Sequence, residues 1–476
     1  MSDHTEKSKV LFANIWLFFL ASFIPKTITF FMVPLYTDCL TTDEYGTIDL
    51  ITTTCQLLLP VLTLQIQDAV LRFSLREKHL EQVFSIGLRI TLLGTLLLCG
   101  GVLCLSAMGF LNMDLAYLLF LIVHFLLSSL KNIMDYFLRA IDKVKQVTIS
   151  TICNSIITVA CNLLFLLVFR WGVRGYLLAN VIGYVFSTLY MFIAARLQRY
   201  VILQKIDSEL VKRVVAFSVP MAIGALSWWA NNSLDKYVLT YFCGFSAAGI
   251  LAVAYKVPTI LSVLGSTISK AFSISAIQHF DYEDRDGFLG KSYGTISYTT
   301  VIFASCLMIL NIPLAKILFQ KDFYRAWLLV PPLLVAATMN HLLGNCEQFL
   351  IAMNNTTMVS LTAILGAGLN LLLNVLLIPC MEAYGAVIST ALGFTVVWLV
   401  RYVYVSHRVN LKNNKIKEPV SYVLLYIQML IAYRGNELLF IQIGILIVLL
   451  VLYRSDITEL ITNLLVKLGI ISEGKE

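Results

Sequence analysis

Long apolar runs recur along the whole chain, and they restrict the fold more than any other feature of the sequence. A membrane-spanning helix needs about 20 mostly apolar residues, and runs of this kind extend from residue 11 to residue 453. Of the 476 residues 59% are hydrophobic and 13% are charged, which is too little polar surface for a soluble protein of this size. Because lipid cannot satisfy backbone polar groups, the runs predict an all-α polytopic membrane protein.

The runs and the breaks between them predict about 14 transmembrane helices. The first run lacks a small-residue cleavage site and is too long for a signal peptide, so we expect it to be retained as a span. The connections are short, and no soluble domain is expected. The predicted spans are 11–37, 46–71, 84–108, 115–138, 147–169, 175–195, 214–241, 249–274, 293–319, 326–352, 357–379, 384–405, 419–433 and 438–453.

Lys and Arg lie mostly on one side of the predicted membrane. They gather before the first span and in the connections that follow the even-numbered spans, at 72–78, 139–145, 196–213, 285–291 and 408–417. Since positive loops stay in the cytoplasm, both termini are predicted to be cytoplasmic. The opposite connections hold Arg170, Arg174, Lys316, Lys321, Arg325 and Arg434.

A polar seam runs through the second predicted span. Its residues are three or four positions apart and therefore share one helix face, which is expected to face protein or water rather than lipid. The seam recurs 203 residues later, where Lys256, Thr259, Ser266 and Lys270 replace four of its members and Gly249 corresponds to Gly46. The seam itself comprises Asp49, Thr53, Gln56, Pro60, Thr63 and Gln67.

Later spans repeat as well. The segment 137–140 corresponds to 349–352 at an offset of 212, as does Asn162 to Asn374, and Gly175 corresponds to Gly385 at an offset of 210. Both halves begin on the same side of the membrane, which predicts two six-helix bundles related by a parallel repeat. The predicted divisions are 1–213, 214–410 and 411–476, and the last contains two extra helices and an amphipathic tail.

Acidic and amide side chains lie within the predicted spans, where each needs a partner, water or a function. Asp135 follows Lys131 by one helical turn, and self-neutralisation of this pair competes with a functional role for it. Glu347 is the repeat counterpart of Asp135 and has no basic residue four positions before it. In the seventh span Asn231, Asn232 and Asp235 lie close together. Interhelical hydrogen bonding competes there with a functional site.

Several lysines are predicted to lie within the membrane. Lys26 stands between Pro25 and Thr27 in the first span, and Lys256 and Lys270 lie two heptads apart in the eighth. Snorkelling to the two interfaces is an adequate explanation for the pair in the eighth span. Alternatively, with Lys131, these cations would attract an anionic solute into a cavity.

Other classes of site receive no support from the sequence. The ten cysteines show no CxxC spacing and the six histidines no HExxH, so neither a disulfide framework nor a metal site is predicted. No nucleophile with a base and no phosphate loop occurs, so the protein is not expected to be an enzyme, to need a cofactor or to bind nucleic acid.

Short motifs across nearly the whole chain resemble those of the polysaccharide-transporter flippases of the multidrug/oligosaccharidyl-lipid/polysaccharide (MOP) superfamily. Two positions depart from the family pattern, because Ala248 stands where the family has Tyr and Lys236 where Arg is common. The motifs are Pro34-Leu35-Tyr36, Glu44-Tyr45-Gly46, Leu71-Arg72-Phe73, Asn232, Asp235-Lys236-Tyr237, Ala248-Gly249, Gly175 with Ala179, and Gly385 with Ser389.

The resemblance implies a MATE-like fold and a flippase in a bacterial or archaeal plasma membrane. It would move a polyprenyl-pyrophosphate-linked oligosaccharide, such as an O-antigen, capsule or exopolysaccharide unit, from the cytoplasmic to the outer leaflet by alternating access. Its expected partners are this lipid-linked oligosaccharide and membrane lipids, with a glycan polymerase as a further candidate.

The residues expected to act in such a cavity fall into two groups. Eight would bind the pyrophosphate or the sugars: Lys26, Thr53, Gln56, Lys131, Asn231, Asn232, Lys256 and Lys270. Three would balance charge or couple transport to H⁺ or Na⁺: Asp135, Asp235 and Glu347.

Three alternative functions remain open at this point. A multidrug or cation antiporter on the same fold is expected to favour acids in its cavity. A lipid II or sporulation-type relative is poorly separated by sequence. A membrane glycan polymerase would need a large outward loop, which the spacing of the spans does not leave room for.

Overall fold

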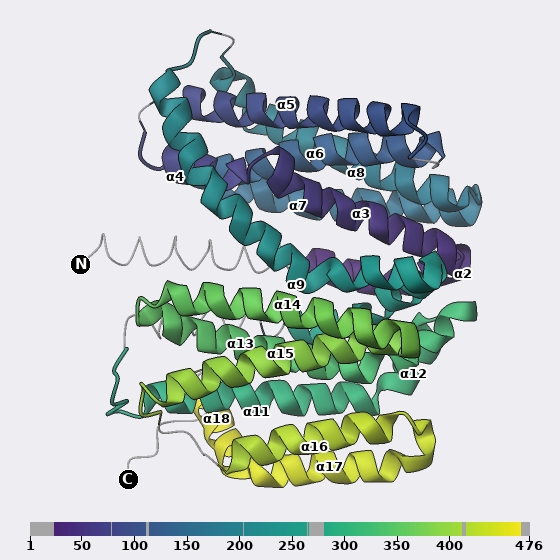
Figure 1. Cartoon of the computed structure of the whole chain (residues 1–476), viewed down its shortest axis with the longest axis vertical. Helices are drawn as coiled ribbons and strands as arrows, with labels where there is room; N and C mark the ends of the chain where they lie inside the picture. Colours follow the sequence, from purple (N-terminus) through teal and green to yellow (C-terminus); the bar gives the residue numbers. More distant parts are fainter. Residues whose placement is uncertain are drawn as a thin grey trace. The chain divides into compact units, whose positions relative to one another are not determined.

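The protein is all-helical in the part that the structure describes. The computed structural model describes residues 23–77, 79–110, 114–202, 204–263, 265, 280–411 and 416–467. In these ranges the regular elements are helices and no strand occurs (Figure 1). Nine of the described helices are long and apolar enough to cross a membrane, or ten when the bent pair Lys321–Leu328 and Val330–Ala352 counts as one span. The predicted all-α polytopic fold is confirmed, while much of the predicted first span lies outside the described residues.

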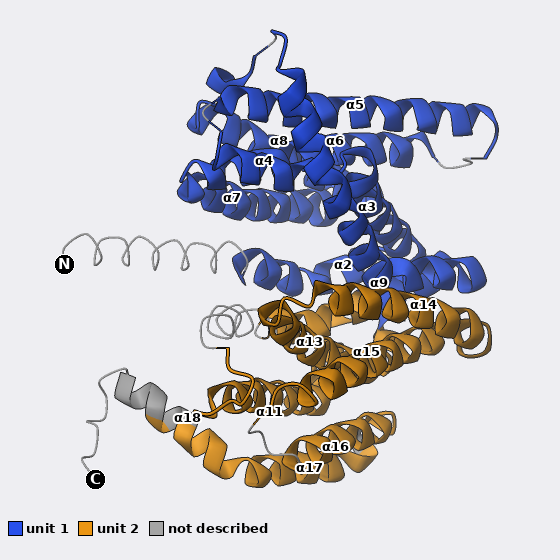
Figure 2. Ribbon diagram, turned by 60° about the vertical axis from the view of Figure 1, so that its left-hand side comes forward, with its two compact units in different colours: residues 1–252, 320–323 blue, residues 253–319, 324–476 orange. Residues whose placement is uncertain are grey.

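The chain divides into two compact units (Figure 2). Unit 1 contains residues 1–252 and 320–323, and unit 2 contains residues 253–319 and 324–476. These units reflect packing, whereas the divisions predicted at 213 and 410 reflect sequence duplication and stay a prediction.

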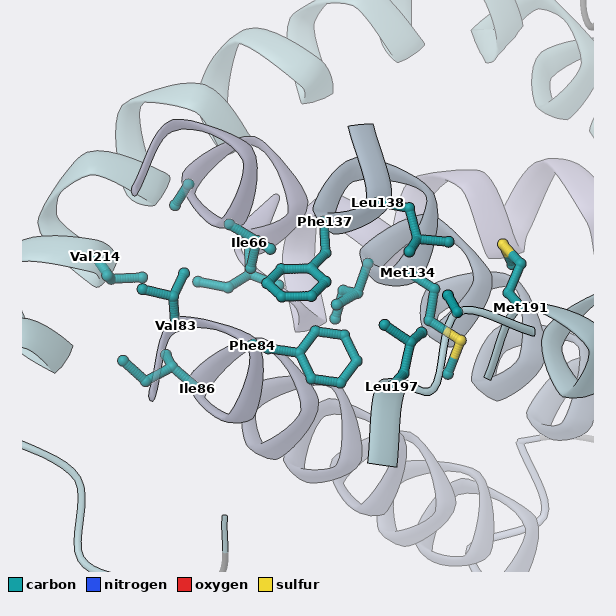
Figure 3. Close-up of a cluster of buried hydrophobic side chains, with 14 of the residues drawn as sticks. Ile66, Val83, Phe84, Ile86, Met134, Phe137, Leu138, Met191, Leu197 and Val214 are labelled. Carbon is teal, nitrogen blue, oxygen red and sulfur yellow. The ribbon is translucent and has the colours of Figure 1, made fainter. Parts of the chain in front are cut away.

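The helices of unit 1 pack around two buried apolar clusters, a small one that includes Cys55 and Phe125 and a larger one that includes Ile66 and Phe84. Figure 3 shows the centre of the larger cluster, where the rings of Phe84 and Phe137 lie 4.6 Å apart between their centroids. Ile66, Phe84 and Phe137 have no exposed surface, so removing any of them would leave a cavity. The helices are α2 (Val33–Cys39), α3 (Thr42–Leu62), α4 (Ile66–Ser74), α5 (Leu80–Ala107), α6 (Leu115–Ala140), α7 (Val144–Asn162), the π-helix η1 (Leu163–Val168), α8 (Gly172–Ala194), the 3-10 helix η2 (Leu197–Tyr200) and α9 (Ser208–Ala254, in unit 1 as far as residue 252).

The start of α3 is fixed by local chemistry. The hydroxyl of Thr41 accepts a hydrogen bond from the backbone N–H of Glu44, and the Glu44 carboxylate accepts one from the backbone N–H of Thr41. This capping box satisfies two backbone donors that the first turn of a helix leaves unpaired. The prediction that the second span begins near residue 46 is therefore close to the observed boundary.

The second predicted span, 46–71, is not one helix. It breaks after Leu62 and resumes as α4 at Ile66. Pro60 has no N–H to continue the helical ladder, and Leu64 and Gln65 both adopt a left-handed backbone with φ of 53°. This conformation costs about 1–2 kcal/mol for each non-glycine residue. The apolar pattern is continuous across the break, so hydropathy alone could not locate it.

Unit 2 contains a second set of helices and a C-terminal hairpin. Its last helix, α18, is tied to the rest of the unit by ion pairs of Lys417 with Asp456, at 3.1 Å, and of Lys291 with Glu459. The helices are α11 (Phe288–Ile309), α12 (Asn311–Leu318), η3 (Lys321–Leu328, shared with unit 1), α13 (Val330–Ala352), α14 (Thr356–Met381), α15 (Ala383–Ser406), α16 (Lys417–Ala432), η4 (Gly435–Leu438), α17 (Leu439–Leu452) and α18 (Arg454–Lys467).

The backbone repeats at the offset predicted from the sequence. Residues with positive φ recur 212 positions apart in three pairs, Gly109 with Lys321, Asp142 with Asn354, and Arg170 with Glu382. Each pair lies at the corresponding turn between two helices. Different side chains share a positive φ at each of these turns, which indicates that the chain path is repeated.

A glycine allows close packing at the start of corresponding helices in both units. A Cβ on Gly175 in α8 would lie 2.9 Å from Cβ of Phe165, and a Cβ on Gly385 in α15 would lie 2.5 Å from the backbone of Leu377. Phe165 and Leu377 are themselves 212 positions apart. The two glycines predicted as repeat counterparts therefore serve the same packing role.

Candidate functional site

The charged face of α6 carries a buried ion pair. Lys131 Nζ lies 2.7 Å from Asp135 Oδ2, and both side chains are about one-tenth exposed. Spacing of one helical turn brings the two groups together, and the structure places this predicted pair as the self-neutralising interpretation describes. The second carboxylate oxygen of Asp135 accepts no hydrogen bond within the described structure. His124 lies on the same face, and its ring contacts that of Tyr184 edge-on, with 5.0 Å between centroids.

A second ion pair joins α3 to α9. Lys236 Nζ donates to Asp49 Oδ2 over 2.7 Å, and the two side chains are 15% and 17% exposed. The long side chain of Lys236 therefore reaches the polar seam of α3. The neighbouring Asp235 is buried, and its carboxylate accepts from the backbone N–H of Lys236.

Two further polar contacts follow the same helix pair. The indole N–H of Trp229 donates to the backbone carbonyl of Thr53 over 3.1 Å, and the hydroxyls of Thr54 and Tyr237 lie 2.6 Å apart. Thr53 is buried, whereas Gln56 is exposed. Of the two seam residues predicted to bind sugars, only Gln56 presents its side chain to open space in this conformation.

The amides of the seventh predicted span bond within their own helix. Asn231 donates to the carbonyl of Ser227 over 3.0 Å, and Asn232 donates to that of Trp228 over 2.8 Å. Both residues are half-buried. A side-chain amide has two donors and an acceptor oxygen, so the contact with Trp228 does not use the full hydrogen-bonding capacity of Asn232.

In unit 2 the acid that corresponds to Asp135 has a different partner. Arg401 Nη1 lies 2.8 Å from Glu347 Oε2, and the same guanidinium donates to the hydroxyl of Thr362 and the carbonyl of Val359 over 2.8 and 3.1 Å. The Arg401 side chain is 3% exposed and that of Glu347 is 37% exposed. The guanidinium is fixed by three hydrogen bonds, whereas the carboxylate side chain is partly exposed.

The predicted cationic residues occupy different environments. Lys26 is exposed, and Lys256 is half-buried and forms no ion pair within the described ranges. Lys270 lies outside the described residues. The structure therefore brings Lys131 into an ion pair and leaves Lys256 without an acidic partner among the residues that are described.

Two residues of these networks were missed in the sequence. Arg401 lies in the twelfth predicted span, where a single Arg in an apolar run is itself a signal that an acidic partner is needed. Asp49 was recognised only as part of the polar seam. Its pairing with Lys236 crosses 187 positions, and no local spacing rule connects residues so far apart.

Metal binding has no support in the described ranges, because no group of three or more His, Cys, Asp and Glu residues is close enough there to hold an ion. The polar networks instead consist of ion pairs and amide or hydroxyl contacts. Such groups can bind an anionic or hydroxylated solute when they face water.

Comparisons with solved structures identify the fold. The lipid II flippase MurJ, in an inward closed conformation, aligns with a TM-score of 0.69 over 92% of this chain and 98% of its own, at 14% identity. An inward-facing multidrug resistance MATE family transporter of the MOP superfamily aligns with a TM-score of 0.63 over 82% and 98% of the two chains, at 13% identity. A MATE transporter of Vibrio cholerae aligns with a TM-score of 0.54 over 89% and 100%, also at 13% identity.

The sequence itself matches one family model, which is described as polysaccharide biosynthesis protein, over residues 11–277. A search of curated protein sequences gives no match. The matched region is more than half of the chain and includes α3, α6 and most of the polar contacts described above. The chain therefore belongs to the polysaccharide biosynthesis protein family and has the fold of the MOP-superfamily transporters.

Proposed function

We propose that the protein is a flippase that moves a polyprenyl-pyrophosphate-linked oligosaccharide from the cytoplasmic to the outer leaflet of a bacterial or archaeal plasma membrane. The observation that carries the proposal is the family match over residues 11–277. The fold shared with MurJ supports it, because MurJ is described as a lipid II flippase.

The distribution of charge favours an anionic solute over a cationic one. Two of the acids considered for coupling are neutralised within the protein, Asp135 by Lys131 and Glu347 by Arg401. Lys256 has no acidic partner among the described residues, and Lys26 is exposed. With Lys270, these two lysines would bind the pyrophosphate, since ammonium groups make strong charge-assisted hydrogen bonds to phosphate oxygens.

Polar side chains on α3 and α9 would contact the sugars. Gln56 is exposed, Asn232 retains hydrogen-bonding capacity beyond its backbone contact, and Asn231 is the neighbouring amide on the same helix. Thr53 and Lys131 would contribute only after their present contacts change. Asp235 is the remaining candidate for coupling to H⁺ or Na⁺, with Asp135 and Glu347 acting chiefly to balance charge.

The test uses purified protein in liposomes that contain a fluorescent polyprenyl-pyrophosphate oligosaccharide. A membrane-impermeant quencher reports which leaflet holds the head group. We expect protein-dependent transfer and a loss of about tenfold or more when Lys26, Lys256 and Lys270 are all changed to Gln, since each lost charge-assisted contact is worth about 1.5–3 kcal/mol. The Lys291→Gln variant, whose lysine pairs with Glu459 outside the proposed path, is the matched control.

The same liposomes separate this function from the alternative. The similarity to MATE transporters favours a multidrug or cation antiporter as the second candidate. Efflux of a cationic dye, together with no transfer of several lipid-linked glycans, would replace the flippase with that antiporter. Unchanged transfer in the triple lysine variant would reject the proposed role of the three lysines but not the proposed flippase function.

A further inference from the structure

Two glycines that are counterparts in the repeat pack against each other. A Cβ on Gly46 in α3 would lie 2.0 Å from the backbone oxygen of Phe245, and a Cβ on Gly249 in α9 would lie 2.0 Å from the backbone oxygen of Thr42. Gly249 is Gly46 plus 203, and Phe245 is Thr42 plus 203. The contact is therefore reciprocal, as at a two-fold axis. Any side chain larger than hydrogen at either glycine would separate the two backbones.

Polar contacts continue along both helices from this crossing. The hydroxyls of Thr42 and Ser246 lie 2.7 Å apart, and further along α3 Asp49 pairs with Lys236. Gly244 places a kink in α9 immediately before the crossing, with φ of 81° and ψ of 177°. Hydrogen bonds and ion pairs of this kind can break and be replaced by water when the surfaces separate, whereas an interdigitated apolar core cannot open as readily.

A break in the helix at the other end of α3 allows the chain to bend there. The break at Leu64 and Gln65 separates α3 from α4, whose residues Ile66 and Val70 are completely buried in the larger apolar cluster of unit 1. At the break a Cβ on Gly94 of α5 would lie 2.5 Å from the carbonyl oxygen of Leu62. Two successive left-handed residues are costly, and such strain persists mainly where it serves function. The break allows α3 to move while α4 stays in the core.

We propose that the crossing of α3 and α9 is a latch that closes one end of the transport path, and that α3 swings about the break at residues 63–65 when the latch opens. The proposal rests on the proposed transport function. With the orientation predicted from Lys and Arg, the latch lies at the extracytoplasmic end. The reciprocal glycine contact sets the closed position, and the pair of Asp49 and Lys236 stabilises it.

Disulfide formation between Thr42→Cys and Ser246→Cys measures the latch directly, because the two side-chain oxygens are in contact. The native Cys39 and Cys243 lie three residues away and are changed to Ala in every sample. An added oxidant takes up the two electrons released when the thiols form the disulfide, and the crosslinked peptide is quantified by mass spectrometry in detergent and in liposomes. We expect rapid crosslinking, and a roughly tenfold lower rate when Gly46→Ala or Gly249→Ala is added, since the closed state is then disfavoured.

Matched variants separate a latch effect from a folding defect. Gly100→Ala and Gly101→Ala in α5 place a Cβ in open space and should leave the crosslinking rate unchanged. Asp49→Lys should lower the rate, and the charge swap with Lys236→Asp should restore it, which no general loss of structure would do. Wild-type crosslinking rates in Gly46→Ala and Gly249→Ala would overturn the proposal.

Transport is measured on the same samples. The crosslinked protein should lose transport, and a reductant should restore it. If the rates respond as expected but no lipid-linked glycan is transported by any sample, the proposed function fails while the latch stands. If transport continues at full rate through the crosslinked protein, the latch fails while the proposed function stands.

Discussion

The two units carry an acid at corresponding positions and neutralise it in different ways. In unit 1, Asp135 of α6 pairs with Lys131 one turn earlier on the same helix. In unit 2, Glu347 of α13 pairs with Arg401, which reaches it from α15. The position of the acid is common to both repeats, but the cation comes from a different place in each.

The residues that occupy the corresponding positions in the other unit explain why each unit needs its own cation. The counterpart of Lys131 is Leu343, and the counterpart of Arg401, at the offset of 210, is Met191. Met191 is completely buried within the larger apolar cluster of unit 1. The comparison teaches that the duplication preserved the chain path and the acid, while the surrounding side chains diverged into two separate networks.

The largest expected effect comes from breaking the pair in unit 1. Lys131→Met leaves the Asp135 carboxylate buried without its cation, and loss of one partner of a buried pair costs about 3–5 kcal/mol. The double variant Lys131→Met with Asp135→Leu should recover most of this loss, since no unpaired charge remains. Thermal unfolding in detergent at a fixed scan rate measures both. Equal stability of the single variant and the wild type would show that water already screens the pair.

The corresponding glycines provide a second comparison. Gly385→Ala forces a Cβ against the backbone of Leu377, which cannot move aside, whereas in Gly175→Ala the nearest atom is the side-chain Cβ of Phe165. Overpacking costs about 1–3 kcal/mol, and we expect Gly385→Ala to lie at the upper end of this range and Gly175→Ala at the lower end. Thermal unfolding midpoints decide the order, with Gly368→Ala, where the Cβ meets nothing within 4 Å, as the control. A reversed order would contradict the assigned contacts.

A smaller effect is expected from Glu347→Gln in unit 2. Arg401 keeps its hydrogen bonds to Thr362 and Val359, and the amide oxygen that replaces the carboxylate can still accept from the guanidinium. The loss should therefore be close to that of one hydrogen bond to a charged group, about 1.5–3 kcal/mol at most. A loss as large as that of Lys131→Met, measured under the same conditions, would mean that the two units do not differ in how they hold their acids.

The smallest effects are expected at the shared turns. Arg170 and Glu382 have φ of 55° and 51°, a conformation that glycine adopts without steric cost. In Arg170→Gly and Glu382→Gly the steric cost in the folded state is removed, which favours folding. Glycine also raises the entropy of the unfolded chain, which opposes folding. The two effects should nearly cancel and change the free energy of unfolding by about 1 kcal/mol or less. Unfolding midpoints that move in opposite directions in the two variants would show that the turns are not equivalent.

Much of the fold could be predicted, because helices and turns depend on local or periodic features of the sequence. Apolar runs locate most of the helices, and the offset of 212 appears again in the backbone at three turns. The break between α3 and α4 was missed, because Leu64 and Gln65 are not residues that favour a left-handed backbone. The predicted boundary between the seventh and eighth spans coincides with the non-helical Gly244, which kinks α9 between residues 241 and 249.

Less of the candidate site could be predicted. The pair of Lys131 and Asp135 follows from helical spacing, whereas Asp49 with Lys236 and Glu347 with Arg401 depend on how separate helices pack. A sequence shows that an intramembrane charge needs a partner, but the partner is selected by tertiary contacts. The roles of the predicted binding and coupling residues stay predictions, and Lys270 lies outside the described residues.

The most direct test joins the proposed substrate to the motion of the latch. The rate of disulfide formation between Thr42→Cys and Ser246→Cys is measured in liposomes with and without a polyprenyl-pyrophosphate oligosaccharide, and again in the variant that lacks Lys26, Lys256 and Lys270. The account predicts that the lipid-linked glycan changes the rate in the first protein and not in the lysine variant, while a cationic dye changes it in neither. A rate that responds to the dye and ignores the glycan would contradict the account.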